Sequence, residues 1–220
     1  MLLFALLSCT KDEPADTAPQ GFAPESFCPG SAGCEDGSGG LSAGAAAVVI
    51  TPPCFESWVD LNDNAELDDG EETLDCGCDR VCPEDEGYAG PDEGEGDGRF
   101  QAVWMAGFQN NRPAAGVRDE LWARAVVLEQ GEVSVAIVVL DVVGWMQPQV
   151  QEIRAQLPEL DHVTVLSTHT HEGPDTMGLW GETESRSGVD SDYRSWVVQQ
   201  AVEAVNQASA DVRAVDHMVV

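Results

Sequence analysis

Basic residues are scarce in this chain of 220 residues. Lys and Arg together number 10, against 40 Asp and Glu, and the formal net charge is -30. Nucleic-acid binding depends on cationic groups that neutralise phosphates, so a nucleic-acid partner is excluded. Electrostatic docking on anionic lipid is disfavoured for the same reason. No run of 18 or more apolar residues occurs either, so no segment is expected to span a bilayer.

Cysteine is missing from the second half of the chain, whereas all seven cysteines lie in the first half. Residues 1–100 also hold 23 acidic and only 3 basic residues. At 43% hydrophobic residues the whole chain has enough apolar material for a core. The composition therefore predicts two regions: an acidic, cysteine-rich N-terminal region and an ordinary globular C-terminal region.

The chain starts with a short apolar run, Met1–Leu7, followed by Ser8 and Cys9. This start resembles a bacterial lipoprotein signal over residues 1–9, with Cys9 as the lipidated residue. A flexible linker is expected over residues 10–42, which are rich in Pro, Gly and Ser. The protein would then be exported and anchored to a bacterial membrane, facing the periplasm or the cell surface. The alternative is a buried N-terminal strand, because the run has no positive residues before it and is short for a signal.

Six cysteines remain when Cys9 is set aside, and an even number in an oxidising compartment predicts disulfides. Three bridges are expected, with 15 possible connectivities. Cys76, Cys78 and Cys82 could instead bind zinc, although their spacing is not that of a standard zinc finger or ribbon.

An acidic insert is expected over residues 54–99, where no apolar periodicity is visible. Within it, the 12-residue stretch 60–71 fits the spacing of an EF-hand calcium loop. The candidate oxygen ligands are Asp60, Asn62, Asn64, Glu66 and Glu71. Ala65 stands where such loops have a glycine. Calcium would act there as a structural ion; the alternative is an acidic surface loop whose spacing is accidental.

The globular C-terminal region has the pattern of a mixed α/β fold, with mixed sheets and flanking helices. Strands are expected over residues 42–51, 120–129, 133–141, 162–168 and 212–220, and helices over 148–157 and from Asp190 to about Ala208. Gln130-Gly131 predicts a hairpin between two of the strands. Asp190-Ser191-Asp192 offers an N-cap to the second helix, and Val197, Ala201, Val205 and Ala208 are expected along its apolar face.

Two histidines in Thr168-His-Thr-His-Glu-Gly-Pro174 follow a predicted strand and lead into a loop. On extended backbone, residues i and i+2 project to the same side, about 6.6 Å apart. Such a pair can present two imidazoles to one metal ion, or one to the metal and one to its substrate. The alternative is two hydrogen-bonded histidines at a strand end.

This motif resembles the Thr-His-Thr-His-Ser-Gly-Pro signature of the neutral/alkaline, non-lysosomal ceramidases and their bacterial relatives. The resemblance covers roughly Ala43 to Val220, apart from the insert. Further similar segments are Ala43–Pro53, Gly107-Phe108, Arg112–Val117, Leu121–Ala125, Val138–Asp141 and Gly178–Gly181.

The resemblance implies a layered α/β domain and a zinc-dependent amidohydrolase that cleaves the N-acyl amide of ceramide-like sphingolipids. By the same resemblance, His169 is a zinc ligand and His171 lines the reacting centre. Asp141, at the end of a neighbouring strand, is a candidate that supports the site, or else a strand-end cap. Glu172 stands where the family has Ser.

The family's other zinc ligands and its reactive Ser lie downstream of this motif, so the chain is expected to be an N-terminal portion of such an enzyme. Only His162 and His217 remain as further histidines, and His162 is expected to face solvent. The second reading is a non-catalytic, calcium-stabilised surface lipoprotein with a binding role.

Overall fold

The structure, a computed structural model, describes residues 39–216. The chain divides into two units, Met1–Asp36 and Gly37–Val220, and all described residues belong to the second. Cys9, most of the predicted linker and His217 therefore lie outside the described residues.

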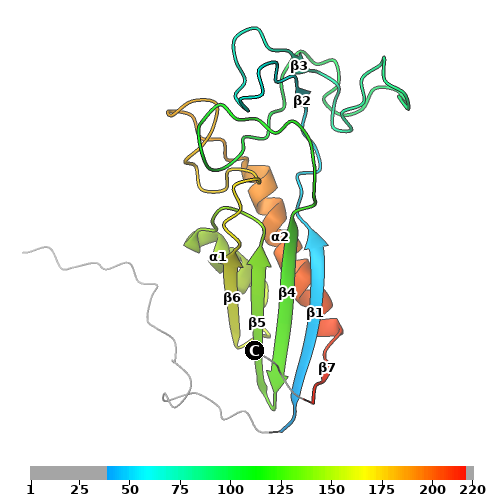
Figure 1. Cartoon of the computed structure of the whole chain (residues 1–220). Coiled ribbons are helices and arrows are strands. Elements are labelled where there is room, and N and C mark those ends of the chain that lie inside the picture. The colour runs from blue at the N-terminus through cyan, green and yellow to red at the C-terminus, as the bar shows by residue number, and fades with distance from the viewer. Residues whose placement is uncertain (1–38, 217–220) are drawn as a thin grey trace, which may run out of the picture. The chain divides into compact units, whose positions relative to one another are not determined.

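A five-stranded sheet with the order β6-β5-β4-β1-β7 forms the centre of the described unit (Figure 1). Three neighbouring pairs, β1–β4, β4–β5 and β1–β7, are antiparallel, whereas β5 and β6 run parallel. The mixed α/β class expected from the sequence is confirmed. The strands are β1 (Leu41–Val49), β4 (Trp122–Gln130), β5 (Val133–Leu140), β6 (His162–Ser167) and β7 (Arg213–Ala214).

The connections around β5 explain where the histidine motif lies. Gln130 pairs with Val133 across a two-residue turn in which Gly131 has a φ of 64°, so the predicted hairpin is confirmed. Parallel strands need a longer crossover, and helix α1 (Gln147–Ala155) supplies it between β5 and β6. The carboxyl ends of β5 and β6 consequently meet at one edge of the sheet, and the motif follows β6 there.

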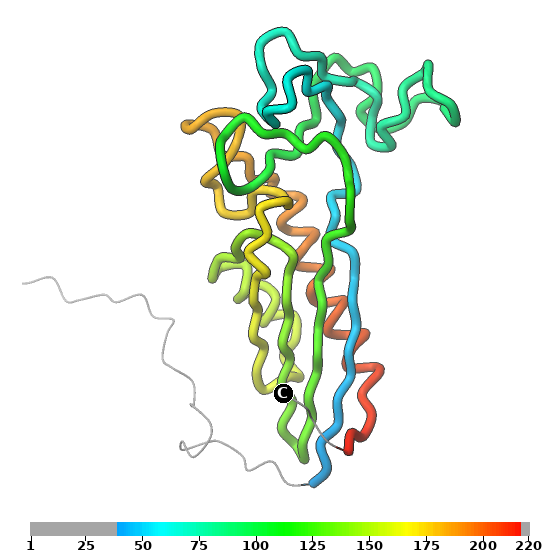
Figure 2. Tube along the Cα trace, viewed as in Figure 1, coloured from blue at the N-terminus to red at the C-terminus, as the bar shows by residue number. Residues whose placement is uncertain are grey.

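Helix α2 (Ser191–Ala210) covers the sheet on the same face as α1 (Figures 1 and 2). Its predicted N-cap is confirmed, because the Asp190 carboxylate accepts hydrogen bonds from the backbone N–H groups of Asp192 and Tyr193. A Cβ on Gly44 would lie 1.9 Å from the carbonyl oxygen of Ala208, so glycine permits the close approach of β1 and α2. The apolar face predicted for this helix is fully buried: Val197, Ala201, Val205 and Ala208.

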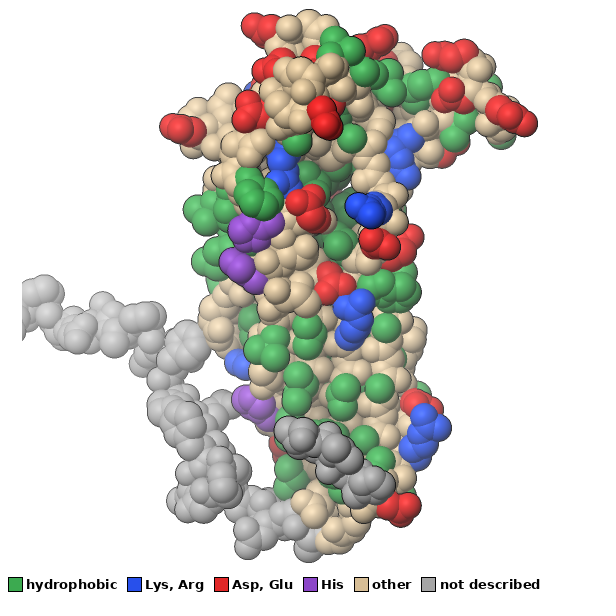
Figure 3. Space-filling view, in the orientation of Figure 1, with side chains coloured by type: hydrophobic (Ala, Val, Ile, Leu, Met, Phe, Trp, Pro, Cys, Tyr) green, Lys and Arg blue, Asp and Glu red, His purple; other side chains and the backbone are tan. Residues whose placement is uncertain are grey.

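The opposite face of the sheet carries exposed aliphatic side chains. Val126 and Ile137 are paired across β4 and β5, and both are exposed, as is Leu166 on β6. Their strand neighbours point the other way into the core, as strand alternation requires. Figure 3 views this face and shows apolar side chains spread over the strands. Neither helix within residues 39–216 combines the length and the apolar content needed to cross a membrane.

Most predicted strand ends differ from the structure by one or two residues: β1 is Leu41–Val49 rather than 42–51, β4 is Trp122–Gln130 rather than 120–129, and β5 ends at Leu140 rather than at residue 141. β6 ends at Ser167 rather than at residue 168, because the backbone turns at His169, whose φ is 62°. The strand predicted over residues 212–220 is limited to Arg213–Ala214 within the described range, and residues 217–220 lie outside that range.

The acidic insert contains little regular structure: a two-stranded ladder of β2 (Ser57–Trp58) and β3 (Thr73–Leu74). Disulfides join Cys54 to Cys78 and Cys76 to Cys82. The predicted oxidation of the cysteines is confirmed for these four, while Cys28 and Cys34 lie outside the described residues. The alternative of a zinc site at the Cys76–Cys82 cluster is wrong, because its thiols are bonded to one another and to Cys54.

Residues 104–113, here called the bridging segment, connect the insert with the loop that follows β6. The backbone N–H of Leu67 in the insert donates to the carbonyl of Asn111 at 2.9 Å. The N–H of Ala106 donates to the carbonyl of Gly173 in the histidine loop at 2.8 Å. The bridging segment therefore contacts both regions through its backbone.

Candidate functional site

The histidine loop begins at the shared carboxyl edge of β5 and β6. The backbone N–H of Thr168 donates to Leu140 at 3.0 Å, and that of His169 donates to Val142 at 3.1 Å. The loop is thus held against the residues that follow β5 before it turns away from the sheet. Loops at the carboxyl ends of parallel strands are the usual place of binding residues in α/β folds.

The imidazole of His169 is held in one tautomer. Its Nδ1 lies 2.6 Å from the carbonyl oxygen of Val143. Because a carbonyl only accepts hydrogen bonds, Nδ1 carries the hydrogen, and in the neutral imidazole Nε2 then keeps its lone pair. In a typical metal-binding histidine, one ring nitrogen donates to a carbonyl and the other is free to bind the metal ion. His169 has this arrangement.

The ring of His171 lies against that of His169, with the two centroids 4.9 Å apart and the planes at 75°. The two Nε2 atoms are 3.4 Å apart. Two nitrogens bound to one tetrahedral zinc ion, each at about 2.0–2.1 Å, are separated by about 3.4 Å. The pair therefore fits two positions around one zinc ion, or a ligand and a neighbour that hydrogen-bonds to it.

The route by which the two imidazoles meet differs from the prediction. Extended backbone predicts that the two side chains project to the same side, about 6.6 Å apart. Instead, His169 adopts a left-handed backbone conformation, and this turn brings the rings edge to face. The two imidazoles lie together, as the shared site requires, but the prediction of extended backbone at His169 is wrong.

Three residues surround the ring of His171. A Cβ on Gly107 would lie 2.3 Å from His171 Nδ1, so only glycine allows the backbone to approach the ring here. The Phe108 ring meets that of His171 edge-on at 5.3 Å, and the Trp180 ring lies 6.4 Å away. His169 is exposed and His171 half-buried, so the pair is open to a solute (Figure 3).

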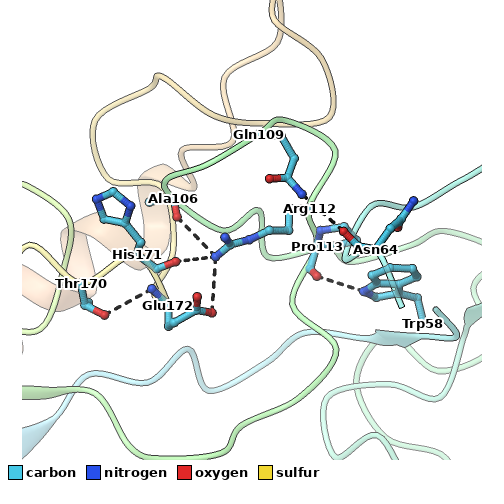
Figure 4. Close-up of polar contacts among 9 residues, drawn as sticks. All are labelled: Trp58, Asn64, Ala106, Gln109, Arg112, Pro113, Thr170, His171 and Glu172. Atoms are coloured by element: carbon cyan, nitrogen blue, oxygen red, sulfur yellow. Dashed lines mark hydrogen bonds and ion pairs between the residues drawn. The ribbon is translucent and has the colours of Figure 1, made fainter. Parts of the chain in front are cut away.

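Arg112, in the bridging segment, contacts the histidine loop (Figure 4). Its guanidinium Nη2 donates to the carbonyl of His171, to the carbonyl of Ala106 at 3.4 Å and to Glu172 Oε2 at 3.4 Å. Only 7% of the Arg112 side chain is exposed. Sequence reasoning gave this residue no role, although a lone Arg beside a proline, in a chain with so few basic residues, could have drawn attention to it.

Asp141 directly follows the last residue of β5, and its carboxylate faces β4. Its Oδ2 accepts hydrogen bonds from Arg124 Nη1 at 2.6 Å and from the backbone N–H of Trp122 at 3.0 Å. Among the described residues its carboxylate contacts neither histidine. His162, as expected, is exposed at the start of β6.

The candidate calcium loop wraps around Asp60. The Asp60 carboxylate accepts hydrogen bonds from four backbone N–H groups, the shortest two from Asp63 at 2.7 Å and Ala65 at 2.8 Å. Burial opposes ionisation of this carboxyl, but the four donors outweigh it and lower its pKa below 3.8. Ala65 has a φ of 61°, the left-handed conformation for which calcium loops use glycine.

The other candidate ligand residues of the loop also make hydrogen bonds within it. Asn62 and Asn64 both donate from Nδ2 to Asp68 Oδ2, at 2.8 and 2.9 Å. Glu71, the last position, accepts from the N–H groups of Leu61 and Asp68. The backbone N–H of Glu66 donates to the side chain of Asn64 at 2.8 Å. Within residues 39–216, no group of three or more His, Cys, Asp or Glu side chains is arranged to hold a metal ion.

A mainly apolar cavity of about 290 Å³ lies beside the histidine loop. Pro174, three residues beyond His171, forms part of its wall, and Trp104 of the bridging segment forms another part. The cavity also reaches the start of α2, where Tyr193 donates from its hydroxyl to the carbonyl of Ile50 at 2.7 Å. The lining also includes Pro52, Pro53 and Trp196, together with two acidic residues at the start of α2, Asp190 and Asp192.

These features define a class: an α/β protein with an open histidine pair at the carboxyl edge of two parallel strands. No family model and no curated protein matches the chain. Among solved structures it is similar to neutral ceramidase from Pseudomonas aeruginosa, with a TM-score of 0.50 and 16% identity over 80% of this chain. A ceramidase complexed with C2 aligns over the same share, with a TM-score of 0.47 and 17% identity.

The chain therefore has the fold of part of neutral ceramidase, as the histidine motif predicted. It spans 22% of the length of each of these two ceramidases.

Proposed function

We propose that this chain carries the histidine pair of a zinc-dependent amide hydrolase of the ceramidase type. The substrate would be the N-acyl amide of a ceramide-like lipid, as the resemblance of the motif implies. One observation carries the proposal: the two Nε2 atoms face each other at 3.4 Å, with the tautomer of His169 fixed by Val143.

His169 would hold the metal through its Nε2 lone pair. His171 would either share the ion or donate a hydrogen bond from Nε2 to a group bound beside it. When bound, zinc would supply an activated water and polarise the acyl carbonyl. The reaction breaks the amide C–N bond, the hydroxyl of water ends on the acyl carbon, and a proton ends on the departing amine.

The apolar cavity beside Pro174 supports a substrate with hydrocarbon chains. Ligand sites are typically apolar with a few polar groups at one end. Here the histidine loop supplies both the polar pair and one wall of the cavity.

Zinc binding by the full chain tests the proposal, since the chain spans only part of a ceramidase and turnover is less decisive. His169→Ala should weaken zinc binding at least 10-fold, and His171→Ala should weaken it less. His162→Ala is the matched control, because this exposed histidine lies at the opposite end of β6. Equal zinc affinity in the wild type and His169→Ala, by isothermal titration calorimetry with metal analysis, would contradict the proposal.

We also propose that the 60–71 loop binds calcium as a structural ion. The oxygen spacing of the loop and its turn around Asp60 support this. The ion would offset repulsion among carboxylates and has no part in the proposed hydrolysis.

Lipid attachment at Cys9, with export to the periplasm or the cell surface, completes the proposal and rests on the lipobox-like sequence Leu6-Leu7-Ser8-Cys9. Intact mass spectrometry of the protein extracted from membranes tests it. A diacylglyceryl modification that is lost in Cys9→Ser supports the anchor, and an unmodified N-terminus contradicts it.

A further inference from the structure

Arg112 is a buried cation whose main partners are neutral. Its Nη2 donates to the carbonyl oxygens of His171 and Ala106. Among residues 39–216 its only acidic partner is Glu172, which is 74% exposed and 3.4 Å away. Exposed ion pairs contribute little, whereas a buried cation must be hydrogen-bonded to avoid a large desolvation cost. The contact with the His171 carbonyl is therefore the important one.

The guanidinium also reaches His171 through an aromatic ring. Arg112 Cζ lies 5.1 Å from the centroid of the Phe108 ring, a separation typical of a cation–π contact. The same ring meets the imidazole of His171 edge-on. Arg112 thus restrains His171 at its backbone carbonyl and, through Phe108, at its side chain.

Arg112 is itself held in place by the insert on both sides. Its neighbour Asn111 exchanges two hydrogen bonds with Leu67, backbone to backbone and from Asn111 Nδ2 at 2.7 Å. Its other neighbour, Pro113, accepts a hydrogen bond from Trp58 Nε1 at 3.0 Å (Figure 4). The guanidinium therefore extends from a fixed backbone toward the histidine loop.

We infer that Arg112 is a positioning residue, which fixes His171 opposite His169 and couples the acidic insert to the histidine pair. The inference rests on the proposed function for its consequence, metal binding, but not for its geometry. It predicts that loss of the guanidinium separates the two rings without unfolding the sheet.

Arg112→Met in the full chain is the test, because Met keeps much of the apolar stem and removes all donors. In the metal-free protein, the nuclear Overhauser contact between Phe108 and His171 should disappear, and the imidazole ¹⁵N shifts of His171 should change. Zinc affinity should fall about 10- to 100-fold, as is typical when a partner that orients a ligand is removed. Arg112→Lys, which keeps one cationic donor, should restore part of both signals.

Two controls separate positioning from a general effect of losing charge. Arg186→Met removes an exposed arginine, paired with Glu182 in a neighbouring loop, and should leave both readouts unchanged. Glu172→Gln removes only the exposed ion pair and should change zinc affinity less than twofold. If Glu172→Gln reproduced the effect of Arg112→Met, the ion pair rather than the carbonyl contact would be responsible, and the inference would be overturned.

The metal-free readout keeps this inference distinct from the proposed function. A wild-type chain that binds no zinc would contradict the proposed function, while the Phe108–His171 contact would still report on Arg112. Retention of that contact and of the His171 shifts in Arg112→Met contradicts the inference whether or not zinc binds. If Arg112→Met fails to fold, the same two signals in Arg112→Lys decide: retention at full strength contradicts the inference, and weakening supports it.

Discussion

The sheet and the acidic insert belong to one compact unit but are stabilised by different interactions. The sheet and its helices bury a continuous aliphatic core in which residues such as Val138, Leu140 and Val197 are fully enclosed. In the insert, two disulfides and many side-chain-to-backbone hydrogen bonds replace most of that core. Asp75, for example, accepts hydrogen bonds from the backbone N–H groups of Gly96 and Gly98.

The difference shows that the acidic residues of the insert have structural roles. Carboxylates that accept backbone N–H groups do in the insert what strand pairing does in the sheet. Hydrogen bonds to Gly98 and Gly96 outweigh burial and lower the pKa of Asp75 below 3.8. Part of the large negative charge is therefore used to close loops.

The largest expected effect is on the sheet. Gly44→Val places a branched side chain where even a Cβ would meet the Ala208 carbonyl at 1.9 Å. We expect a loss of about 3 kcal/mol or more in the free energy of unfolding, because a close-packed interface must separate. Denaturant unfolding followed by far-UV circular dichroism measures it. A wild-type stability would show that α2 can shift at no cost, and Ala45→Val, at an exposed position of the same strand, is the control.

Removal of the Cys54–Cys78 disulfide should act on the insert alone. The bridge spans 24 residues, and loss of such a cross-link costs about 3 kcal/mol in the chain-entropy model. In Cys54→Ser/Cys78→Ser, amide hydrogen exchange should become fast throughout residues 56–99 and stay slow in β4 and β5. Faster exchange in the strands would mean that the two regions unfold together.

Calcium should stabilise the insert by a slightly smaller amount. At 100 times its dissociation constant, a bound ion contributes about 2.7 kcal/mol. Asp60→Ala should abolish this calcium-dependent rise in unfolding temperature. Asp69→Ala removes the same charge at loop position 10, which supplies no candidate ligand, and should keep most of the rise. Equal loss in the two variants would indicate general screening of charge instead of a site.

The smallest effect concerns pH and Glu56, whose side chain is buried. Burial raises the pKa of Glu56 above 4.5, although hydrogen bonds from Gln101 and Gly77 oppose the shift. The folded insert therefore favours the protonated form of Glu56. The contribution of this protonated side chain to the free energy of unfolding is complete below pH 4.5 and is lost as the pH rises through the raised pKa. Carboxyl ¹³C NMR should show Glu56 titrating above 4.5, and a midpoint at or below 4.5 would contradict the assignment of its environment.

Much of the sheet could be predicted from the sequence because its signals are local. Aliphatic runs marked β4 and β5, and Gly131 marked their turn. The apolar face of α2 followed from helical spacing, and its first residue from Asp190. None of these features depends on a distant partner.

The site was harder to predict because its geometry depends on contacts between distant segments. His169 turns out of the strand conformation only because the residues after β5 hold its backbone and ring. Arg112 meets His171 across 59 positions in the sequence. The cysteine pairing was likewise open, since spacing alone allows 15 connectivities.

The bridging segment has a consequence for how this protein can be modified. The bridging segment contacts the insert on one side and the histidine loop on the other. Changes in the insert can therefore alter the position of the histidine pair. Substitutions at Trp58, whose indole N–H donates to Pro113, would vary the placement of Arg112 while leaving every residue of the five-stranded sheet unchanged. The placement of the histidine pair and the stability of the sheet can therefore be altered separately.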